Sequence, residues 1–152
     1  NRDVKDVKPS NLFTVKTASP SPAKMIAIVT GSNKGIGYFI AKKLVDAGLH
    51  VIVACRNERG GRAAAAEIGA EFELLDIDSD ASIASFVQRF ASKYGCLDVL
   101  VNNAAILGSP NVPFAQRTEP TLRTNFHGLV ALTDRLLPLL RAAAFLRSVE
   151  GK

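Results

Sequence analysis

The sequence predicts an α/β protein built on a doubly wound parallel sheet. Two observations carry this prediction. Short apolar runs rich in β-branched residues alternate with segments whose apolar residues recur at helical spacing. A glycine-rich segment, TGSNKGIG at residues 30–37, separates the first apolar run from the first helical segment. Strands that alternate with helices pair in parallel, and right-handed crossovers then place helices on both faces of the sheet.

The first strand and the first helix flank the glycine-rich segment. MIAIVT (25–30) is a continuous apolar run, typical of a strand that is buried on both faces. The helix that follows ends before Gly48, and its apolar face is expected to consist of Ile36, Ile40, Leu44 and Ala47. Tyr38 lies about 200° around the helix from Ile36. We therefore predict that Tyr38 faces away from the buried side.

Three more strands and three more helices follow in alternation. The strands are HVIVAC at 50–55, a run from Phe72 that leads into Asp76, and LDVLVNN at 97–103. The helices are 62–69, a helix capped by Ser79 that runs to Tyr94, and a long helix from Leu122 to Ala144. The helix capped by Ser79 would bury Ile83, Phe86, Val87 and Phe90. A loop rich in Pro, Gly and Asn is expected at 108–120.

This element order predicts a sheet with the strands in the order 3-2-1-4. That is the Rossmann-type arrangement, whose ligand crevice lies at the carboxyl ends of the strands. The glycine-rich segment falls at this crevice. Gly31 ends the first strand, and Gly35 and Gly37 flank the start of the helix, so free N–H groups could receive a diphosphate there. The alternative is a tight turn without a ligand, but the place of the glycines between strand and helix favours a phosphate site.

Length and composition limit the other possibilities. A chain of 152 residues suits one domain, and 47% apolar residues can form an ordinary core. Residues 1–24 hold five Lys/Arg and two Asp/Glu, so 14 basic residues accompany 12 acidic ones in the remainder, which is no nucleic-acid footprint. No apolar run reaches the ~18 residues that span a membrane. Cys55 and Cys96 fit packing roles in a reducing compartment rather than a disulfide framework.

Residues 1–24 are treated as a separate segment. They contain three prolines and little periodicity, which predicts a disordered leader ahead of a domain at 25–152. A targeting remnant is the alternative, although Asp3 and Asp6 weaken it. A cytoplasmic protein is therefore expected, and an organellar one if the leader is such a remnant.

Four motifs together resemble the short-chain dehydrogenase/reductase family. They are TGSNKGIG after the first strand, LDID at 75–78, VNNAA at 101–105 and TNFHG at 124–128. The NKGIG form of the loop, ACRN at 54–57 and the LLPLL run are most similar to the NADPH-dependent carbonyl reductases of that family. The resemblance covers residues 25 to about 146. It implies an NADP cofactor and a small-molecule carbonyl substrate for the full-length form.

The resemblance also assigns cofactor-binding residues. Around the pyrophosphate and the adenosine ribose it places Gly31, Ser32, Asn33, Gly35, Ile36 and Gly37. Lys34 and Arg56 would receive a 2′-phosphate, because the second strand ends without the acidic residue that selects NAD. Asp76 and Ile77 would bind the adenine, although Asp76 could instead cap a helix. Asn103, Ala104 and Ala105 would approach the cofactor ribose, while Asn102 would stabilise the end of the strand.

The catalytic residues implied by the family are incompletely represented. Asn125 matches an asparagine that kinks the long helix and holds a proton-relay water in the family. The family's proton donor is a tyrosine with a lysine four residues later, and the one such pair here, Tyr38 and Lys42, lies in the first helix and is not expected to act. Ser148, His50 and His127 are expected to be structural, and no metal site is expected.

Two functions therefore stay open from the sequence. One is the cofactor-binding half of an NADPH-dependent carbonyl reductase, truncated after the fourth strand and its following helix. The other is a non-catalytic nucleotide-binding or interaction module. In either case the fourth strand is expected to be an exposed apolar edge, through which the chain could form oligomers.

Overall fold

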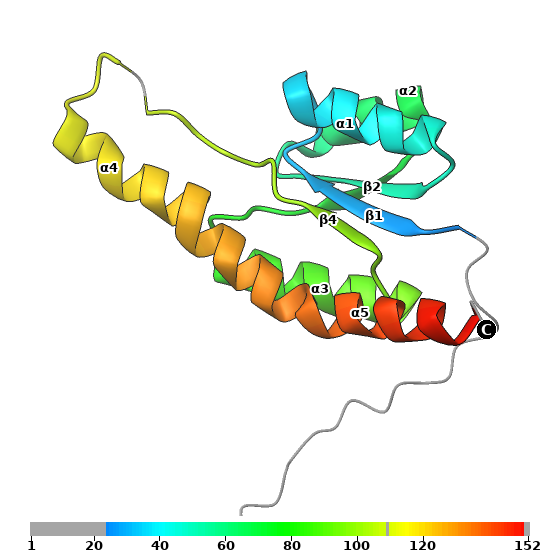
Figure 1. The fold of residues 1–152 in the computed structure, drawn as a ribbon. Helices are drawn as coiled ribbons and strands as arrows, with labels where there is room; N and C mark the ends of the chain where they lie inside the picture. Colours follow the sequence, from blue (N-terminus) through cyan, green and yellow to red (C-terminus); the bar gives the residue numbers. More distant parts are fainter. Residues whose placement is uncertain (1–23, 109, 151–152) are drawn as a thin grey trace, which may run out of the picture.

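The computed structural model describes residues 24–108 and 110–150. They form one parallel sheet in the order β3-β2-β1-β4, which confirms the predicted order (Figure 1). The strands are β1 (Ile26–Thr30), β2 (His50–Cys55), β3 (Glu71–Leu74) and β4 (Val99–Val101). Except for Lys24, the predicted leader at 1–24 lies outside the described residues.

Helices cover both faces of the sheet (Figure 1). Alternate residues of β1 and β2 point to opposite faces, so each strand contributes to two cores. Ala27 and Val29 pack toward α1 (Gly35–Asp46) and α2 (Glu58–Ile68). Ile26 and Ile28 pack toward α3 (Asp80–Tyr94) and α5 (Leu129–Glu150). Both faces of the central strands are therefore dry, as the continuous apolar runs predicted.

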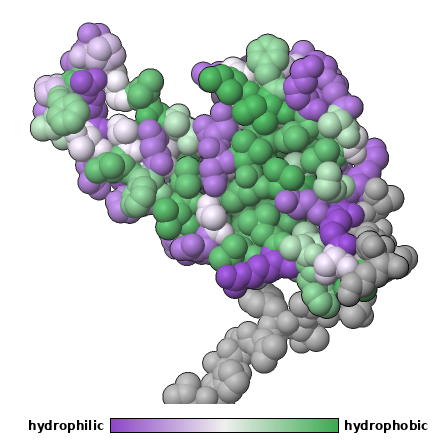
Figure 2. All heavy atoms as spheres, in the orientation of Figure 1, coloured by the Kyte–Doolittle hydropathy of each residue, from purple (hydrophilic) through white to green (hydrophobic). Residues whose placement is uncertain are grey.

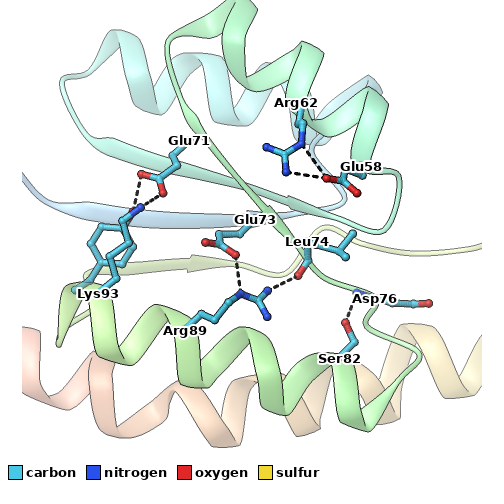
Figure 3. A network of polar contacts seen from close by, with 10 residues as sticks. Glu58, Arg62, Glu71, Glu73, Leu74, Asp76, Ser82, Arg89 and Lys93 are labelled. Carbon is cyan, nitrogen blue, oxygen red and sulfur yellow. Dashed lines mark hydrogen bonds and ion pairs between the residues drawn. The ribbon is translucent and has the colours of Figure 1, made fainter.

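The edge strand β3 is fastened to α3 by charged side chains. Arg89 bonds the Glu73 carboxylate at 3.2 Å and the Leu74 carbonyl at 3.1 Å, and Lys93 pairs with Glu71 (Figure 3). These contacts fix the position of β3 relative to α3. After β3 ends at Leu74, the chain continues into the loop that contains Asp76.

The start of α2 differs from the prediction. The helix begins at Glu58 rather than at Arg62, because the Asn57 side chain accepts a hydrogen bond from the Gly60 N–H at 2.8 Å. The predicted cap at Ser79 is confirmed, and its hydroxyl accepts from the Ser82 N–H at 3.2 Å. Both caps satisfy N–H groups that a helix start leaves without partners.

The buried face of α1 was predicted correctly for Ile40 and Leu44, which are half-buried against the core, but not for the rest of the helix. Gly37 and Ala41 are buried, whereas Ile36 is 77% exposed and Tyr38 is half-buried against the sheet-facing core. The two small residues let the helix approach the sheet closely, so the buried face is formed by them together with Ile40, and Ile36 is left outside it. A hydrogen bond with Glu67 raises the pKa of Tyr38.

The long helix begins inside the predicted loop at 108–120. It consists of α4 (Phe114–Leu122), a π-helical turn η1 (Arg123–Gly128) and α5, without interruption. Pro120 lies within α4, where it removes one backbone donor. The helix tolerates this because α4 buries none of its residues, so water can bond the freed carbonyl. Composition alone indicated a loop, and this part of the prediction was wrong.

The segment from β4 to α4 leaves the body at the carboxyl ends of the strands. Figure 1 shows α4 projecting beyond the sheet, and Figure 2 shows the surface hollowed between this arm and the body. Cys55 and Cys96 are buried free thiols, in line with the packing roles predicted for them. Within the part of the chain that the structure describes, no helix is long and apolar enough to cross a membrane.

Candidate functional site

A pocket lies at the carboxyl ends of all four strands, where the sequence placed the crevice. Ten of the predicted site residues line it: Gly31, Asn33, Lys34, Gly35, Arg56, Asp76, Ile77, Asn103, Ala104 and Ala105. Four predicted residues do not line it, namely Ser32, Ile36, Gly37 and Asn125. The structure therefore gathers side chains from segments far apart in the sequence around one cavity.

The glycine turn has one packed side and one open side. Gly31 has φ +65°, and a Cβ there would lie 2.8 Å from the Cα of Ala104. Gly35 has φ +61° with open space around the position of a Cβ, and it lines the pocket. Only glycine adopts this left-handed conformation without strain. The backbone at Gly35 is thus accessible from the pocket, as a phosphate-binding turn requires.

Two of the residues predicted to contact the cofactor, Ser32 and Gly37, are buried and contact other parts of the protein. Ser32 is fully buried, and its hydroxyl donates to the Val29 carbonyl at 2.6 Å. A Cβ at Gly37 would overlap the side-chain amide of Asn103. Ile36, the third residue of this segment outside the pocket lining, is exposed. Ser32 and Gly37 therefore shape the turn rather than line the pocket.

Thr30 is a site residue that the sequence reasoning missed. Its hydroxyl accepts hydrogen bonds from the N–H groups of Asn103 at 3.0 Å and Ala104 at 2.9 Å. The Asn103 side chain donates in return to the Thr30 carbonyl at 2.8 Å. A buried threonine at the end of the apolar run, directly before the glycines, was the available signal. These bonds join the ends of β1 and β4 and fix the floor of the pocket.

Asn102 and Asn103 have different structural roles from those predicted. Asn103 stabilises the strand ends, while the exposed Asn102 donates to the Thr133 hydroxyl of α5 at 3.1 Å. The sequence had given the strand-end role to Asn102. The difference follows from strand geometry, because successive side chains point to opposite faces of the sheet. Contact of Asn103 and Ala104 with a ribose stays a prediction.

Two positively charged side chains, Lys34 and Arg56, lie on one side of the pocket. Lys34 and Arg56 are exposed and line the cavity, and within residues 24–108 and 110–150 neither forms an ion pair. Lys34 is also the N-cap of α1 and makes no side-chain capping bond, whereas Asn57 and Ser79 cap α2 and α3. The first turn of α1 therefore offers N–H groups and a positive dipole end to an anion.

The loop after β3 forms the wall next to Arg56, because β3 pairs with β2. The Asp76 N–H donates to the Ser82 hydroxyl at 2.9 Å, and the Asp76 side chain points away from that serine (Figure 3). One Asp76 carboxylate oxygen accepts from the Asp78 N–H at 3.1 Å. Ile77 is buried, and its carbonyl lies against Gly128, where any side chain would overlap it. The loop is thus held by its own turn and by the long helix.

Asn125 lies in the π-turn and fixes the segment after β4. Its side-chain oxygen accepts from the Ile106 N–H at 2.8 Å, and its side-chain nitrogen donates to the Ile106 carbonyl at 2.9 Å. Both ends of the amide are therefore occupied by one residue of the pocket wall. Single π-turns within α-helices are frequent at functional sites. A direct part for Asn125 in proton relay stays a prediction.

Neither tyrosine lies at the pocket. Tyr38 is on α1, where a hydrogen bond with Glu67 of α2 raises its pKa. Tyr94 donates to Glu71 at 2.7 Å and contacts His50 at 3.2 Å, near the amino ends of β2 and β3. Burial, reinforced by the bond to Glu71, raises the pKa of Tyr94 to about 12. Both tyrosines are structural in this arrangement.

Ser148, His50 and His127 also lie outside the pocket. Ser148 donates to the Phe145 carbonyl of its own helix at 2.7 Å, and His50 packs against Tyr94. His127 is exposed beside Phe126. Among the described residues, no three His, Cys, Asp or Glu side chains are placed to hold a metal ion.

Comparison with known proteins places this site in context. A sequence model described as short chain dehydrogenase matches residues 25–147. Carbonyl reductase (NADPH) 1 of Mus musculus is 40% identical over 129 residues, with 80% of this chain and 47% of the relative covered. The Bos taurus protein of the same name gives the same identity and coverage. The chain thus spans about half the length of the curated relatives it matches.

Solved structures show the same arrangement of elements. Salutaridine reductase of Papaver somniferum matches with a TM-score of 0.71 at 26% identity, over 78% of this chain and 54% of that one. The Pseudomonas aeruginosa RhlG structure, an NADP active-site complex, matches with a TM-score of 0.70 at 29% identity, over 78% of this chain and 48% of that one.

Proposed function

The chain belongs to the short-chain dehydrogenase family, and from this premise we propose that it forms the NADP-binding part of a reductase acting on carbonyl compounds. The observation that carries the proposal is the meeting of the open glycine turn with Lys34 and Arg56 at one pocket. The name of the similar carbonyl reductases, which states NADPH, supports the same cofactor.

The residues present fit the phosphate groups of such a cofactor. The open space at Gly35 and the uncapped first turn of α1 would receive the pyrophosphate. Lys34 and Arg56 would bind the 2′-phosphate, Arg56 through its planar fork and Lys34 as a point charge. No carboxylate lies at the end of β2, where Ala54 and Cys55 stand instead. These features favour NADP over NAD.

The wall formed by the loop after β3 would receive the adenine, and the floor would receive the ribose. The Asp76 side chain and the backbone at Ile77 line the pocket on that side, and Asn103 and Ala104 close its floor. When bound, the nicotinamide would supply a hydride for carbonyl reduction. The residues of this pocket bind and orient, and Asn125 holds the Ile106 segment that borders it.

The tyrosine that the family uses as proton donor has no counterpart among the described residues of the pocket, since both tyrosines lie elsewhere. We therefore expect the 152-residue chain to bind the nucleotide without turning it over. Carbonyl reduction would belong to the full-length form. A non-catalytic nucleotide-binding module is the second candidate, and the distance of both tyrosines from the pocket favours it.

Equilibrium titration with NADPH and NADH tests the cofactor proposal. Arg56→Asp should weaken NADPH binding by about tenfold or more, because it removes a charge-assisted hydrogen bond, and should spare NADH. Arg62→Gln is the matched control, because Arg62 lies on α2, where it pairs with Glu58, and does not line the pocket. Equal effects of Arg56→Asp on both cofactors would remove the 2′-phosphate role.

Assays of NADPH oxidation with small carbonyl compounds test the catalytic part. The chain should show no rate above background, and both candidates predict this for the 152 residues alone. A robust rate that Tyr38→Phe abolishes would overturn the structural role of Tyr38. The two candidates separate if a longer form of the protein reduces carbonyl compounds, as only the reductase predicts.

We further propose a cytoplasmic protein without nucleic-acid or membrane partners. Two buried free thiols support a reducing compartment. The near balance of 14 basic and 12 acidic residues beyond residue 24 supports the absence of nucleic-acid binding.

A further inference from the structure

Two ion pairs connect the loop after β3 with the long helix. Arg123, in the π-turn, donates through Nε and Nη2 to the two carboxylate oxygens of Asp78, at 2.5 Å and 2.6 Å. Farther along the same helix, Arg135 contacts the Asp80 carboxylate at 2.8 Å. The first pair is bidentate and joins directly to the pocket wall, because Asp78 donates its N–H to Asp76.

Asp78 is an acidic group beside the cationic side of the pocket. The hydrogen bonds from Arg123 lower the pKa of Asp78, and the charge of Arg56 adds to this effect. The Leu75 N–H donates to the Cys55 carbonyl at 3.1 Å, so Arg56 and the loop that contains Asp78 leave the ends of two neighbouring strands. The proposed function assigns that same arginine to a 2′-phosphate. The Asp78 carboxylate and the phosphate would therefore both be attracted to Arg56.

A free carboxylate at Asp78 would oppose phosphate binding. It would repel the phosphate and attract Arg56 toward itself, and charges several ångströms apart near a protein surface interact strongly enough to change binding roughly three- to tenfold. A guanidinium that bonds both oxygens of a carboxylate offsets the negative charge of that carboxylate, and the guanidinium itself stays protonated. Arg123 forms this contact.

We propose that Arg123 is a positioning residue that sets the preference for a 2′-phosphorylated adenosine ribose. It occupies the carboxylate of Asp78 and so leaves Arg56 available to the phosphate. This inference rests on the proposed function, and it adds to that function a residue on an element distant from the glycine turn.

The loop keeps other supports when Arg123 is changed. Gly128 packs directly on the Ile77 carbonyl, and Asp76 remains bonded to Ser82. Arg135 still joins the long helix to Asp80. Loss of the Arg123 side chain therefore changes the local charge more than the position of the wall.

Calorimetric titration of the 152-residue chain with 2′,5′-ADP and with 5′-AMP tests the inference. Arg123→Gln should weaken 2′,5′-ADP binding by roughly three- to tenfold and leave 5′-AMP unchanged. Arg135→Gln, the matched control, should change neither. Adding Asp78→Asn to Arg123→Gln should restore 2′,5′-ADP binding to within about twofold of the original chain, because the opposing charge is gone.

Three results would overturn the inference. One is an equal loss for both nucleotides in Arg123→Gln, and another is a double variant that fails to recover. If Arg123→Gln fails to fold by circular dichroism, Asp78→Asn alone decides. It should bind 2′,5′-ADP as tightly as the original chain or tighter, and weaker binding is the third contrary result. An original chain that binds both nucleotides equally or not at all would instead remove the proposed cofactor function.

Discussion

Gly35 and Gly37 stand two positions apart and serve different purposes. Gly35 supplies a left-handed backbone in open space, whereas Gly37 supplies close contact with Asn103. We expect Gly35→Ala to cost about 1–2 kcal/mol through backbone strain. Gly37→Ala should cost more, because the methyl group would displace Asn103 from Thr30 and loosen the pocket floor. Urea unfolding of both variants measures the difference, and equal losses would contradict it.

Asp98 links three elements and should make stability depend on pH. It accepts from the Ile26 N–H at 2.7 Å and from Arg147 at 2.9 Å and 3.2 Å. Burial alone would raise the pKa of Asp98, but the bonds from Arg147 and Ile26 lower it below its usual range. A lowered pKa in the folded state stabilises the protein above the unfolded pKa, and the effect is lost as pH falls through the folded pKa.

Asp98→Asn should therefore reduce the free energy of unfolding by about 1–3 kcal/mol at pH 7. The difference between the variant and the original chain should shrink as the pH falls below about 4, near the usual pKa of an aspartate. Unfolding curves measured between pH 3 and pH 7 check both expectations. A difference that stays constant over this range would contradict the charge-based account.

At the scale of elements, the π-turn and the segment after β4 depend on each other. The Asn125 side-chain amide accepts one hydrogen bond from the Ile106 N–H and donates one to the Ile106 carbonyl. Asn125→Ala would leave that N–H and that carbonyl without protein partners, at a cost of about 1–3 kcal/mol. Hydrogen exchange at the Ile106 amide should accelerate, while exchange in β1 should change little. Unchanged exchange at Ile106 would show that the segment is held by other contacts.

At the scale of the whole molecule, the two edges of the sheet differ in chemistry. The β3 edge carries Glu71 and Glu73, both paired with α3, whereas β4 has the apolar sequence VLV. Figure 2 shows hydrophobic residues gathered over the middle of the molecule between α1 and α5, around this strand. Unpaired apolar edges favour association between chains.

We therefore propose that the 152-residue chain associates through β4. Light scattering should show oligomers whose proportion rises with protein concentration. Val99→Lys should reduce association, since a charged edge resists pairing, whereas Glu73→Gln on the opposite edge should leave it unchanged. A monomer at all concentrations, or an equal effect of the two variants, would contradict this use of β4.

The sequence by itself determined the strand order, the two dry faces of the sheet and the place of the pocket. These features follow from local patterns, because continuous apolar runs require helices on both sides and parallel strands bring their carboxyl ends to one edge. The glycine turn could therefore be placed at this edge from the pattern alone, whereas the resemblance to a family assigned Asp76, Ile77 and Asn103, which line the same pocket.

Only the tertiary structure decided how the pocket is held together. The bond of Thr30 to the end of β4, the paired bonds of Asn125 to Ile106 and the contact of Gly128 with Ile77 join residues far apart in the sequence. No local pattern specifies such partners. The buried face of α1 also depended on how closely Gly37 and Ala41 let the helix approach the sheet, and the start of α4 within a Pro-rich segment depended on solvent reaching its backbone. Close packing and long-range hydrogen bonds, rather than residue type, set these features.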